Sequence, residues 1–411
     1  MKYKHIFRRG KQKMAAVPVF FTEKGDCMKL LHLADLHIGK RVNEFSMLED
    51  QRAILKQILE VAEQEMPDAV LIAGDVYDKT IPPGEAVSVL DDFLTGLAFL
   101  RLPVFMISGN HDSAERLGFG SRILRRQGIT IAAAYDGALE PILLQDEYGV
   151  VELYLLPFIK PALAAPFFPE KELECTEDAV RLILESVSEQ PNYRRVLVAH
   201  QFVTNRGELP QQSDSETAYV GGSDAVDAGV FHAFDYVALG HLHGPQKMLC
   251  DTIRYAGSPL KYSFSESRQK KSVTIVELME KGNTFIRQIP LVPLRDMREI
   301  RGPIDQLTDP QVVDSANSQD YIHATLTDTE ELMDPIGRLR RFYPNIMRLD
   351  FENRFSKETK QKNAASGEDL SQKTPMELFQ DFFQMQNQKE MTQEQTQIME
   401  ALFLSNQEGT R

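Results

Sequence analysis

Five short polar clusters along this 411-residue chain contain side chains that bind metals or transfer protons. Together they supply two aspartates, one asparagine and five histidines as candidate ligands and acids. Groups of these types suit two adjacent divalent cations and leave one imidazole over. Two such cations favour hydrolysis at phosphorus, because they stabilise both the attacking and the leaving oxygen. In chain order the clusters are Asp35-Leu36-His37, Gly74-Asp75-Val76-Tyr77-Asp78, Gly109-Asn110-His111-Asp112, His200 and Gly240-His241-Leu242-His243.

Seven residues of these clusters are the predicted metal ligands. Asp35 and His37 occupy positions i and i+2 of an extended segment, so both side chains face the same way. Asp75 follows a glycine that allows a turn, and its carboxylate can bridge two cations. Mixed oxygen and nitrogen ligands suit Mn²⁺, Fe²⁺ or Zn²⁺ better than Mg²⁺ or Ca²⁺, and without thiolates we favour Mn²⁺. The predicted set is Asp35, His37, Asp75, Asn110, His200, His241 and His243.

The remaining histidine has a different predicted role. His111 directly follows Asn110, so the two side chains diverge and His111 is free to reach the phosphate. It would orient the phosphate or protonate the leaving oxygen. Asp112 is predicted to hold the other ring nitrogen of His111. For Asp78, an outer-shell contact and a loop cap remain equally open.

Apolar, strand-like runs precede every cluster, which favours a shared position for all of them. Each run ends where a ligand-type residue begins, and the carboxyl ends of parallel strands form the usual site of an α/β sheet. Any one of these clusters, taken alone, is more simply explained as a turn or a surface feature. The prediction of a metal site therefore depends on all the clusters occurring together in this order. The strands are expected at 30–34, 69–73, 104–108, 196–199 and 236–239, and helices at 48–64, 82–100, 114–127 and 177–189.

The whole pattern predicts an α/β fold with a two-sheet β-sandwich flanked by helices, followed by smaller parts. A small α+β unit and two amphipathic helices follow the sandwich, and the helices either fold back or bind a partner. The polar segment 204–227 after His200 is either functional or an ordinary surface loop. The predicted segments are an N-terminal extension 1–27, a main domain 28–292, an α+β capping domain 293–352, a linker 353–374 and C-terminal helices 375–411.

Composition narrows the possible partners and location. The formal net charge is −14, which argues against a protein that holds nucleic acid by bulk electrostatics. The leader is different, since seven basic and two acidic residues give its first 28 positions a charge of +5. No apolar stretch is long enough for a membrane helix. The three cysteines form no CxxC pair, so a reducing cytoplasm fits the sequence.

The clusters and their flanks resemble the calcineurin-like metallophosphoesterase superfamily. Within it, the chain looks like the SbcD family, the nuclease subunits of bacterial SbcCD complexes, strongly over 28–293 and more loosely beyond. The basic leader has no counterpart in that family. The matching motifs are Leu31-His32-x-x-Asp35-x-His37-x-Gly39, Ala73-Gly74-Asp75-Val76-Tyr77-Asp78, Ser108-Gly109-Asn110-His111-Asp112-Ser113, Tyr236-x-Ala238-Leu239-Gly240-His241-x-His243 and Tyr255-x-Gly257-Ser258-Pro259.

The resemblance implies a Mn²⁺-dependent nuclease that acts in DNA repair, recombination and replication. Its expected activities are exonuclease on duplex ends and endonuclease on hairpins or single strands, in the cytoplasm at the nucleoid. It also implies His111 as the phosphate-facing catalytic residue. One cation would be held by Asp35, His37, Asp75 and His243, and the other by Asp75, Asn110, His200 and His241.

The same resemblance implies partners. The C-terminal helices would bind the coiled-coil base of an SbcC-type ATPase, and residues 294–351 would contact DNA. A homodimer within a heterotetramer is expected through helices near 45–62 and 113–125. Burial in the core is an equally good explanation for the apolar residues of those helices, which are Phe45, Leu48, Leu117 and Phe119.

Two other functions remain open. The first is a small-molecule or protein phosphoesterase with the same cations, although such an enzyme needs neither a capping domain nor a helical pair. The second is a DNA-end tether that mainly supports the ATPase. The complete set of predicted ligands disfavours a tether without catalytic activity.

Overall fold

The computed structural model describes residues 4–7, 16–21, 27–187, 190–216, 222–330, 332–352, 374–387 and 390–408. The expected linker 353–374 lies outside these residues except for Thr374. Two compact units make up the chain. The first contains residues 1–299 and 319–323, and the second contains residues 300–318 and 324–411.

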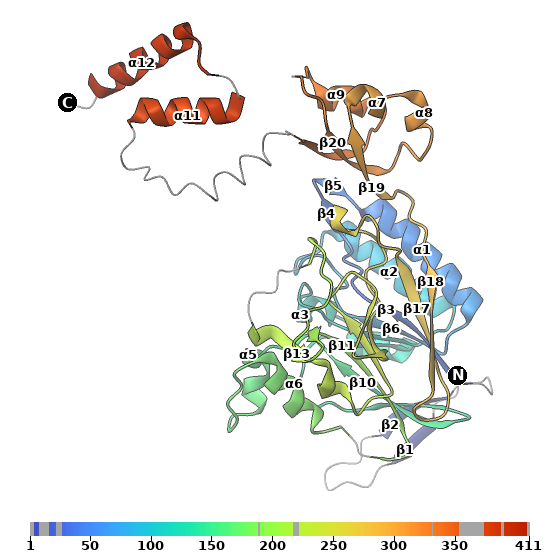
Figure 1. The fold of residues 1–411 in the computed structure, drawn as a ribbon. Coiled ribbons are helices and arrows are strands. Elements are labelled where there is room, and N and C mark those ends of the chain that lie inside the picture. The colour runs from blue at the N-terminus through green and yellow to red at the C-terminus, as the bar shows by residue number, and fades with distance from the viewer. Residues whose placement is uncertain are drawn as a thin grey trace. The chain divides into compact units, whose positions relative to one another are not determined.

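Two large sheets face each other in the first unit (Figure 1). The smaller consists of β3 (Met28–Leu33), β6 (Ala69–Ala73), β7 (Val104–Ile107), β8 (Ile129–Ala132), β17 (Ser272–Leu278) and β18 (Thr284–Pro290). Its strand order is β18-β17-β3-β6-β7-β8. Strands β3, β6, β7 and β8 run parallel, so their carboxyl ends share one edge of the sheet.

The larger sheet has the order β1-β2-β9-β10-β11-β14-β16-β15. Strands β10, β11, β14 and β16 are parallel neighbours, and β11 ends at His200. Part of the leader belongs to this sheet, because β2 pairs with β9. The strands are β1 (Lys4–Phe7), β2 (Ala16–Phe21), β9 (Ile142–Asp146), β10 (Gly149–Leu156), β11 (Arg194–His200), β14 (Tyr236–Gly240), β15 (Gln246–Met248) and β16 (Cys250–Tyr255).

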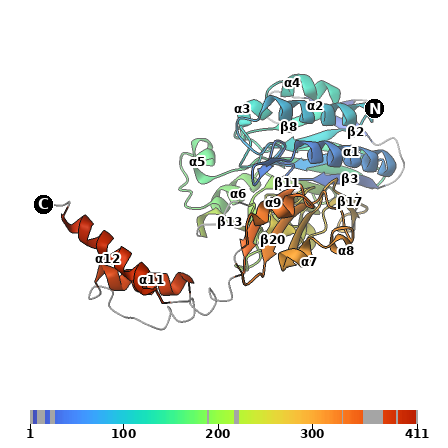
Figure 2. The ribbon, with the colours of Figure 1, turned by 90° about the horizontal axis from the view of Figure 1, so that it is seen from above.

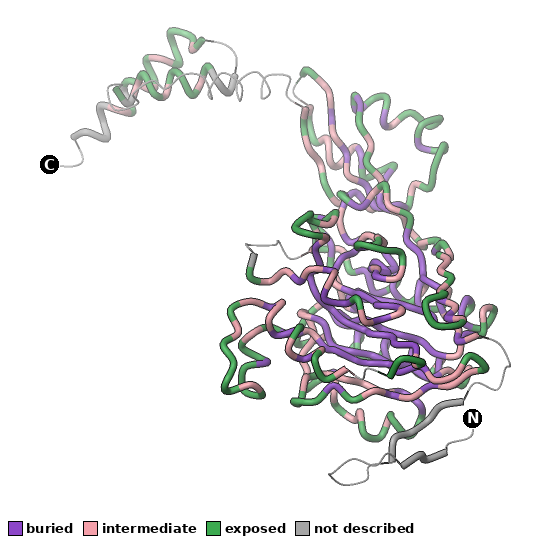
Figure 3. Tube along the Cα trace, turned by 60° about the horizontal axis from the view of Figure 1, so that its bottom comes forward, coloured by how far each residue is buried: buried purple, intermediate pink, exposed green. Residues whose placement is uncertain are grey.

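An apolar core fills the space between the sheets (Figure 3). Leu30, Leu71 and Phe105 enter it from the smaller sheet, and Leu153 and Val196 enter it from the larger one. All five are fully buried. Burial of each such side chain stabilises the fold by about 1.5–3 kcal/mol, so the core holds the two parallel edges in register.

Helices cover the outer faces of the sandwich. Helices α1 (Leu48–Glu65) and α2 (Gly84–Phe99) lie side by side (Figure 2). In α1, Ile54, Leu55 and Ile58 form a buried stripe with helical spacing. On the other side, α6 (Thr176–Leu184) packs Val180 and Ile183 into a second apolar cluster with residues of β10 and β11.

The helix predicted over 114–127 is wrong as a single element. It consists of α3 (Ala114–Leu117), α4 (Ser121–Leu124) and a 3-10 turn at Arg125–Gln127. The chain leaves the helix at Gly118 and takes a left-handed conformation at Gly120, where φ is +72°. Glycine adopts that conformation without the steric cost of a Cβ, so two glycines within three residues end the helix.

The segment 297–352, most of which belongs to the second unit, contains short elements and a small apolar core. Its core includes Leu307, Leu339 and Ile346, and the hydroxyl of Tyr343 donates to the carbonyl of Leu307. Strands β19, β20 and β21 form a three-stranded sheet in that order. The bounds are β19 (Met297–Gly302), α7 (Ile304–Leu307), α8 (Pro310–Val313), β20 (Tyr321–Leu326), α9 (Pro335–Arg340) and β21 (Ile346–Phe351).

Two helices end the described chain, α11 (Pro375–Asn387) and α12 (Gln393–Glu408). Each begins with a capping box, in which a threonine and a residue three positions later exchange hydrogen bonds with the backbone. Thr374 pairs with Glu377 in this way, and Thr392 pairs with Gln395. The predicted fold class, a helix-flanked sandwich with smaller α+β and helical parts, is confirmed. No helix among the described residues is long and apolar enough to cross a membrane.

Candidate metal centre

The predicted ligands lie where strands of both sheets end. Four of them have positive φ, an uncommon conformation for residues other than glycine. The angles are 53° at Asp35, 44° at His37, 48° at Asp75 and 112° at His241. Such backbone costs of order 1–3 kcal/mol per residue and persists where packing enforces it. The sharp turns aim these side chains back over the strand ends.

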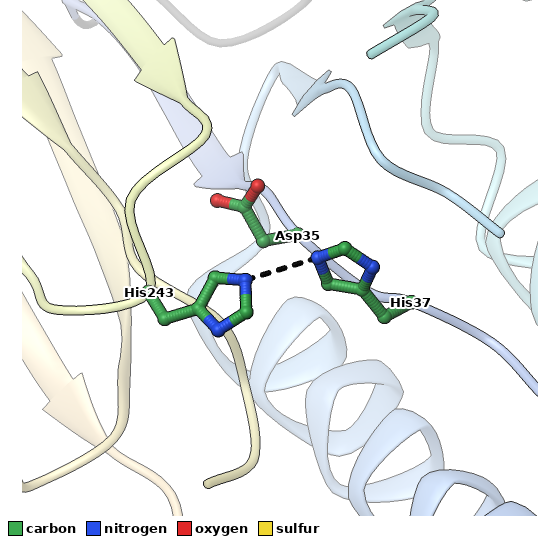
Figure 4. A group of neighbouring side chains, drawn as sticks. All are labelled: Asp35, His37 and His243. Atoms are coloured by element: carbon green, nitrogen blue, oxygen red, sulfur yellow. Dashed lines mark hydrogen bonds between the residues drawn. The ribbon is translucent and has the colours of Figure 1, made fainter. Parts of the chain in front are cut away.

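Asp35, His37 and His243 form the first group of converging side chains (Figure 4). Nε2 of His37 lies 3.0 Å from Nε2 of His243, and all three residues are buried. Asp35 accepts a hydrogen bond from the backbone N–H of His241 through Oδ1, at 2.9 Å. One carboxylate oxygen thus anchors the turn, while the other stays directed into the site.

Asp75 lies between this group and a second one. Its Oδ2 is 3.7 Å from Nε2 of His37 and 3.3 Å from Nε2 of His200. Oδ1 of Asn110 lies 3.1 Å from Nε2 of His200 and 2.9 Å from Nδ1 of His241. The structure therefore brings all seven predicted ligands together, in two groups with Asp75 between them.

Burial and charge set the protonation of these groups. Burial alone would raise the pKa of Asp75 and lower that of His200, because it disfavours both charged forms. The attraction between the two groups is stronger. It holds the pKa of Asp75 well below its usual range and raises that of His200 to about 9. Burial lowers the pKa of His37 well below its usual value and that of His241 to about 3. Burial, with the nearby charge of Asp75, raises the pKa of Asp35.

These residues fit a pair of divalent cations. Oδ2 of Asp35 is a buried polar atom without a hydrogen-bond partner, which is costly in a native fold. Neutral imidazoles and carboxylates are the forms that bind cations, and burial lowers the pKa of His37 and of His241, which favours the neutral ring at both. A bound cation would satisfy Oδ2 of Asp35 and neutralise the clustered carboxylates.

His111 lies at the edge of the group with a fixed ring. Its Nδ1 contacts the backbone carbonyl of Asp78 at 2.9 Å, so Nδ1 carries the proton and Nε2 keeps its lone pair or accepts a second proton. The ring packs edge-on against His37, with centroids 4.9 Å apart. Asp78 thus acts through its main chain, while its carboxylate pairs with Lys40 at 2.9 Å.

The predicted contact between Asp112 and His111 is wrong. The Asp112 carboxylate instead accepts hydrogen bonds from the backbone N–H groups of Val76, Tyr77 and Gly109 at 2.9–3.1 Å. It ties the loops after β6 and β7 together, and the backbone of Asp78 takes the place expected for Asp112. Three N–H donors attract a short acidic side chain more strongly than one ring nitrogen does.

Two supporting residues have no chemical signature in the sequence. Gln51 of α1 donates to the carbonyl of His37 at 2.7 Å and accepts from the N–H of Gly39 at 2.9 Å. The hydroxyl of Tyr262 donates to the carbonyl of Leu36. Both hold the left-handed turn at His37. Gln51 and Tyr262 are 211 positions apart in the chain. No local sequence pattern could therefore predict that both support the same turn.

Two families match this chain. The calcineurin-like phosphoesterase family matches residues 28–245, which include every predicted ligand. The family described as Type 5 capsule protein repressor C-terminal domain matches residues 293–387. The first match covers more than half of the chain and accounts for the two-sheet fold.

Curated relatives narrow the family further. A Staphylococcus epidermidis protein, named as the D subunit of the nuclease SbcCD, is 35% identical over 326 residues, which cover 78% of this chain and 85% of that protein. The chain belongs to the SbcD family. A second relative with the same name, from Staphylococcus saprophyticus, is 33% identical over 323 residues, 78% of this chain and 84% of its own. As a member of the family, the chain is a phosphodiester hydrolase of the nuclease type.

Solved structures include two with related descriptions. A dimetal phosphatase from Danio rerio has a TM-score of 0.38 and 11% identity, and covers 66% of this chain and 99% of its own. An archaeal phosphodiesterase has a TM-score of 0.29 and 12% identity, and covers 64% and 100%. At this level of similarity, neither structure bears on the substrate.

Proposed function

We propose that this SbcD family member is a Mn²⁺-dependent DNA nuclease that hydrolyses phosphodiesters with two cations. Its substrates are duplex ends, hairpins and single strands, and it works with an SbcC-type coiled-coil ATPase in DNA repair, recombination and replication. The observation that supports this most strongly is the convergence of seven oxygen and nitrogen donors in two groups, with Asp75 between them.

The ligand assignment follows the two groups. Asp35, His37, Asp75 and His243 would hold one cation. The second would be held by Asp75 with Asn110, His200 and His241. When bound, the cations would supply Lewis-acid stabilisation of the phosphate and would lower the pKa of water. Mixed nitrogen and oxygen ligands without thiolate support Mn²⁺ as the working ion.

His111 is the proposed catalytic residue outside the ligand set. The Asp78 carbonyl keeps the proton on Nδ1, so Nε2 exchanges protons with the substrate side of the site. From there it would orient the phosphate or protonate the leaving oxygen, a contribution worth about 10²–10⁴-fold in rate. Asp112 has no direct part in this chemistry, because its carboxylate is occupied by three backbone donors.

The C-terminal helices support a partner that covers apolar side chains. Leu378 and Phe382 of α11 are 38% and 52% exposed, and Ile398 and Leu402 of α12 are 57% and 52% exposed. Apolar residues at helical spacing that stay exposed are typical of helices that bind in or against a groove. We assign them to the coiled-coil base of the ATPase.

The remaining proposals concern organisation and location. We propose that the chain has five parts with separate roles. They are a leader 1–27, a nuclease domain 28–292, a capping domain 293–352, a linker 353–374 and partner-binding helices 375–411. A homodimer within a heterotetramer is proposed for the assembly. Phe119 is 86% exposed and available for such a contact, whereas Leu48 and Leu117 are buried. We place the complex at the nucleoid in the cytoplasm.

Cleavage of a hairpin-ended duplex with Mn²⁺, with and without the ATPase, tests the proposed function. We expect cleavage by this chain with Mn²⁺ and a stronger activity with the ATPase present. Hydrolysis of a phosphomonoester without any DNA cleavage would favour the small-molecule phosphoesterase. Unchanged DNA repair in cells that carry a non-cleaving His111→Gln variant would favour the tether.

A further inference from the structure

A buried ion pair lies next to His243. Glu266 is fully buried and Lys271 is 5% exposed, and the ammonium of Lys271 contacts the Glu266 carboxylate at 2.5 Å. Lys271 also donates to the carbonyl of His243 at 2.8 Å and to the hydroxyl of Ser258 at 3.0 Å. A buried charge persists only when it is paired and hydrogen-bonded, and this pair satisfies both conditions.

Ser215 connects this ion pair to the imidazole of His243. Its Oγ is 2.7 Å from Nδ1 of His243 and 2.6 Å from Oε1 of Glu266. Glu216, the next residue, accepts from the backbone N–H of His243 at 2.7 Å. Both residues belong to the polar segment 204–227 after His200, so part of that segment contacts the metal centre.

The hydrogen bonds have only one consistent direction. Glu266, paired with the Lys271 ammonium, is an ionised carboxylate and can only accept. The hydroxyl of Ser215 therefore donates its proton to Glu266, and its oxygen accepts from Nδ1–H of His243. That tautomer leaves the lone pair of His243 on Nε2, the atom that faces His37. It is also the form that a cation requires at Nε2.

We propose that Ser215, Glu266 and Lys271 are positioning residues that fix the tautomer and ring orientation of His243 for metal binding. The inference rests on the proposed role of His243 as a ligand. His200 differs, because its Nδ1 is held by the backbone carbonyl of Ala73 at 2.8 Å. At His243 the side chains of Ser215 and Glu266, rather than a backbone carbonyl, hold Nδ1–H. The metal site therefore depends on the position of segment 213–216.

The first test measures Mn²⁺ binding to the full-length chain by isothermal titration calorimetry. Ser215→Ala removes the acceptor of Nδ1–H and is expected to weaken binding at one site about 10- to 100-fold. Ser215→Thr keeps a hydroxyl and should restore most of the affinity. Ser263→Ala is the matched control, because Ser263 also donates to Oε1 of Glu266, at 3.0 Å, but does not contact His243. It should stay within about twofold of the wild type.

The second test reads the tautomer without any metal. Two-bond ¹H–¹⁵N spectra of protein with ¹⁵N-labelled histidine distinguish Nδ1–H from Nε2–H. We expect His243 to be protonated at Nδ1 in the wild type and in Ser263→Ala, and mixed in Ser215→Ala. A folded Ser215→Ala protein with unchanged tautomer and affinity would overturn the proposal, as would an equal loss of affinity in Ser263→Ala. A wild type that binds no Mn²⁺ would contradict the proposed function, and the spectra would still test the role of Ser215 at His243.

Discussion

The Nε2 atoms of His37 and His243 lie 3.0 Å apart, although 206 positions separate the two residues in the chain. The first follows β3 of the smaller sheet, and the second follows β14 of the larger one. Two imidazole nitrogens this close share at most one proton, and the Asp35 carboxylate lies beside them. The contact shows that the ends of strands from both sheets build one site, which neither sheet contains alone.

Asp75→Asn should remove metal and activity together. The amide oxygen can still accept from the N–H of His111, at 2.9 Å in the wild type, so the turn is preserved. The charge between His37 and His200 is lost, and hydrolysis should fall by at least about 100-fold. Metal content by plasma mass spectrometry and DNA hydrolysis are the measurements. Asp91→Asn on the exposed face of α2 is the control, and full metal content in Asp75→Asn would contradict the assignment.

His111→Gln should separate metal binding from turnover. The ring does not belong to the proposed ligand set, so metal content should match the wild type. The rate should fall by about 10²–10⁴-fold, because no group remains to exchange a proton at Nε2. His232→Gln, a change of an exposed histidine, is the control. Normal turnover with normal metal content in His111→Gln would exclude the catalytic role.

Gly109→Ala should distort the bridge between the two groups. A Cβ at this position would overlap both the carboxylate and the main chain of Asp75. Such overpacking costs about 1–3 kcal/mol and should also weaken metal binding. Gly84→Ala at the start of α2 is the matched control, because nothing lies within 4 Å of its added Cβ. Urea unfolding and Mn²⁺ titration of both variants check this expectation; equal effects at the two positions would refute it.

Glu65 should add stability that depends on pH. The guanidinium of Arg287 hydrogen-bonds to Glu65 and holds the pKa of that carboxyl below its usual value of 4.5. A lowered folded-state pKa gives stability that is present above the unfolded pKa and is lost as pH falls. Since the pair is partly exposed, Glu65→Gln should cost only about 0.2–1 kcal/mol at neutral pH. Urea midpoints of wild type and variant should converge below pH 4.5; a difference that grows in acid would contradict the sign.

Deletion of residues 375–411 should abolish partner binding and spare the metal centre. The exposed apolar side chains of α11 and α12 are then absent, whereas every proposed ligand remains. Co-purification with an SbcC-type ATPase and Mn²⁺ titration are the two measurements. A milder variant, Phe382→Asp, should also lose the partner, since a charge replaces a half-exposed aromatic ring. Continued co-purification of the truncated chain would refute the role of these helices.

Strand-end patterns predicted most of the fold, and they predicted the side chains that converge in the candidate site. The apolar runs before Asp35, Asp75 and Asn110 are β3, β6 and β7, because buried parallel strands need continuous apolar residues. The positive φ angles at Asp35 and Asp75 could not be predicted in this way. They arise from packing between loops that are distant in sequence, and local residue types do not encode them.

The missed contacts have a common physical origin. Asp112 binds backbone donors of a different loop, and that choice depends on how closely β6 and β7 bring the loops together. Ser215 reaches His243 and Glu266 over separations of 28 and 51 positions. A serine in a polar loop has no periodicity or motif that marks it. Such contacts become visible only once the strands fix the positions of the loops.

Stepwise Mn²⁺ addition to the metal-free chain, with cleavage of a hairpin-ended duplex as the readout, tests the two-cation site most directly. Calorimetry on the same samples counts the bound ions. We predict two bound Mn²⁺ per chain, with cleavage that appears only as the second site fills. Full cleavage with one bound ion, or no cleavage with both sites filled, would contradict the account.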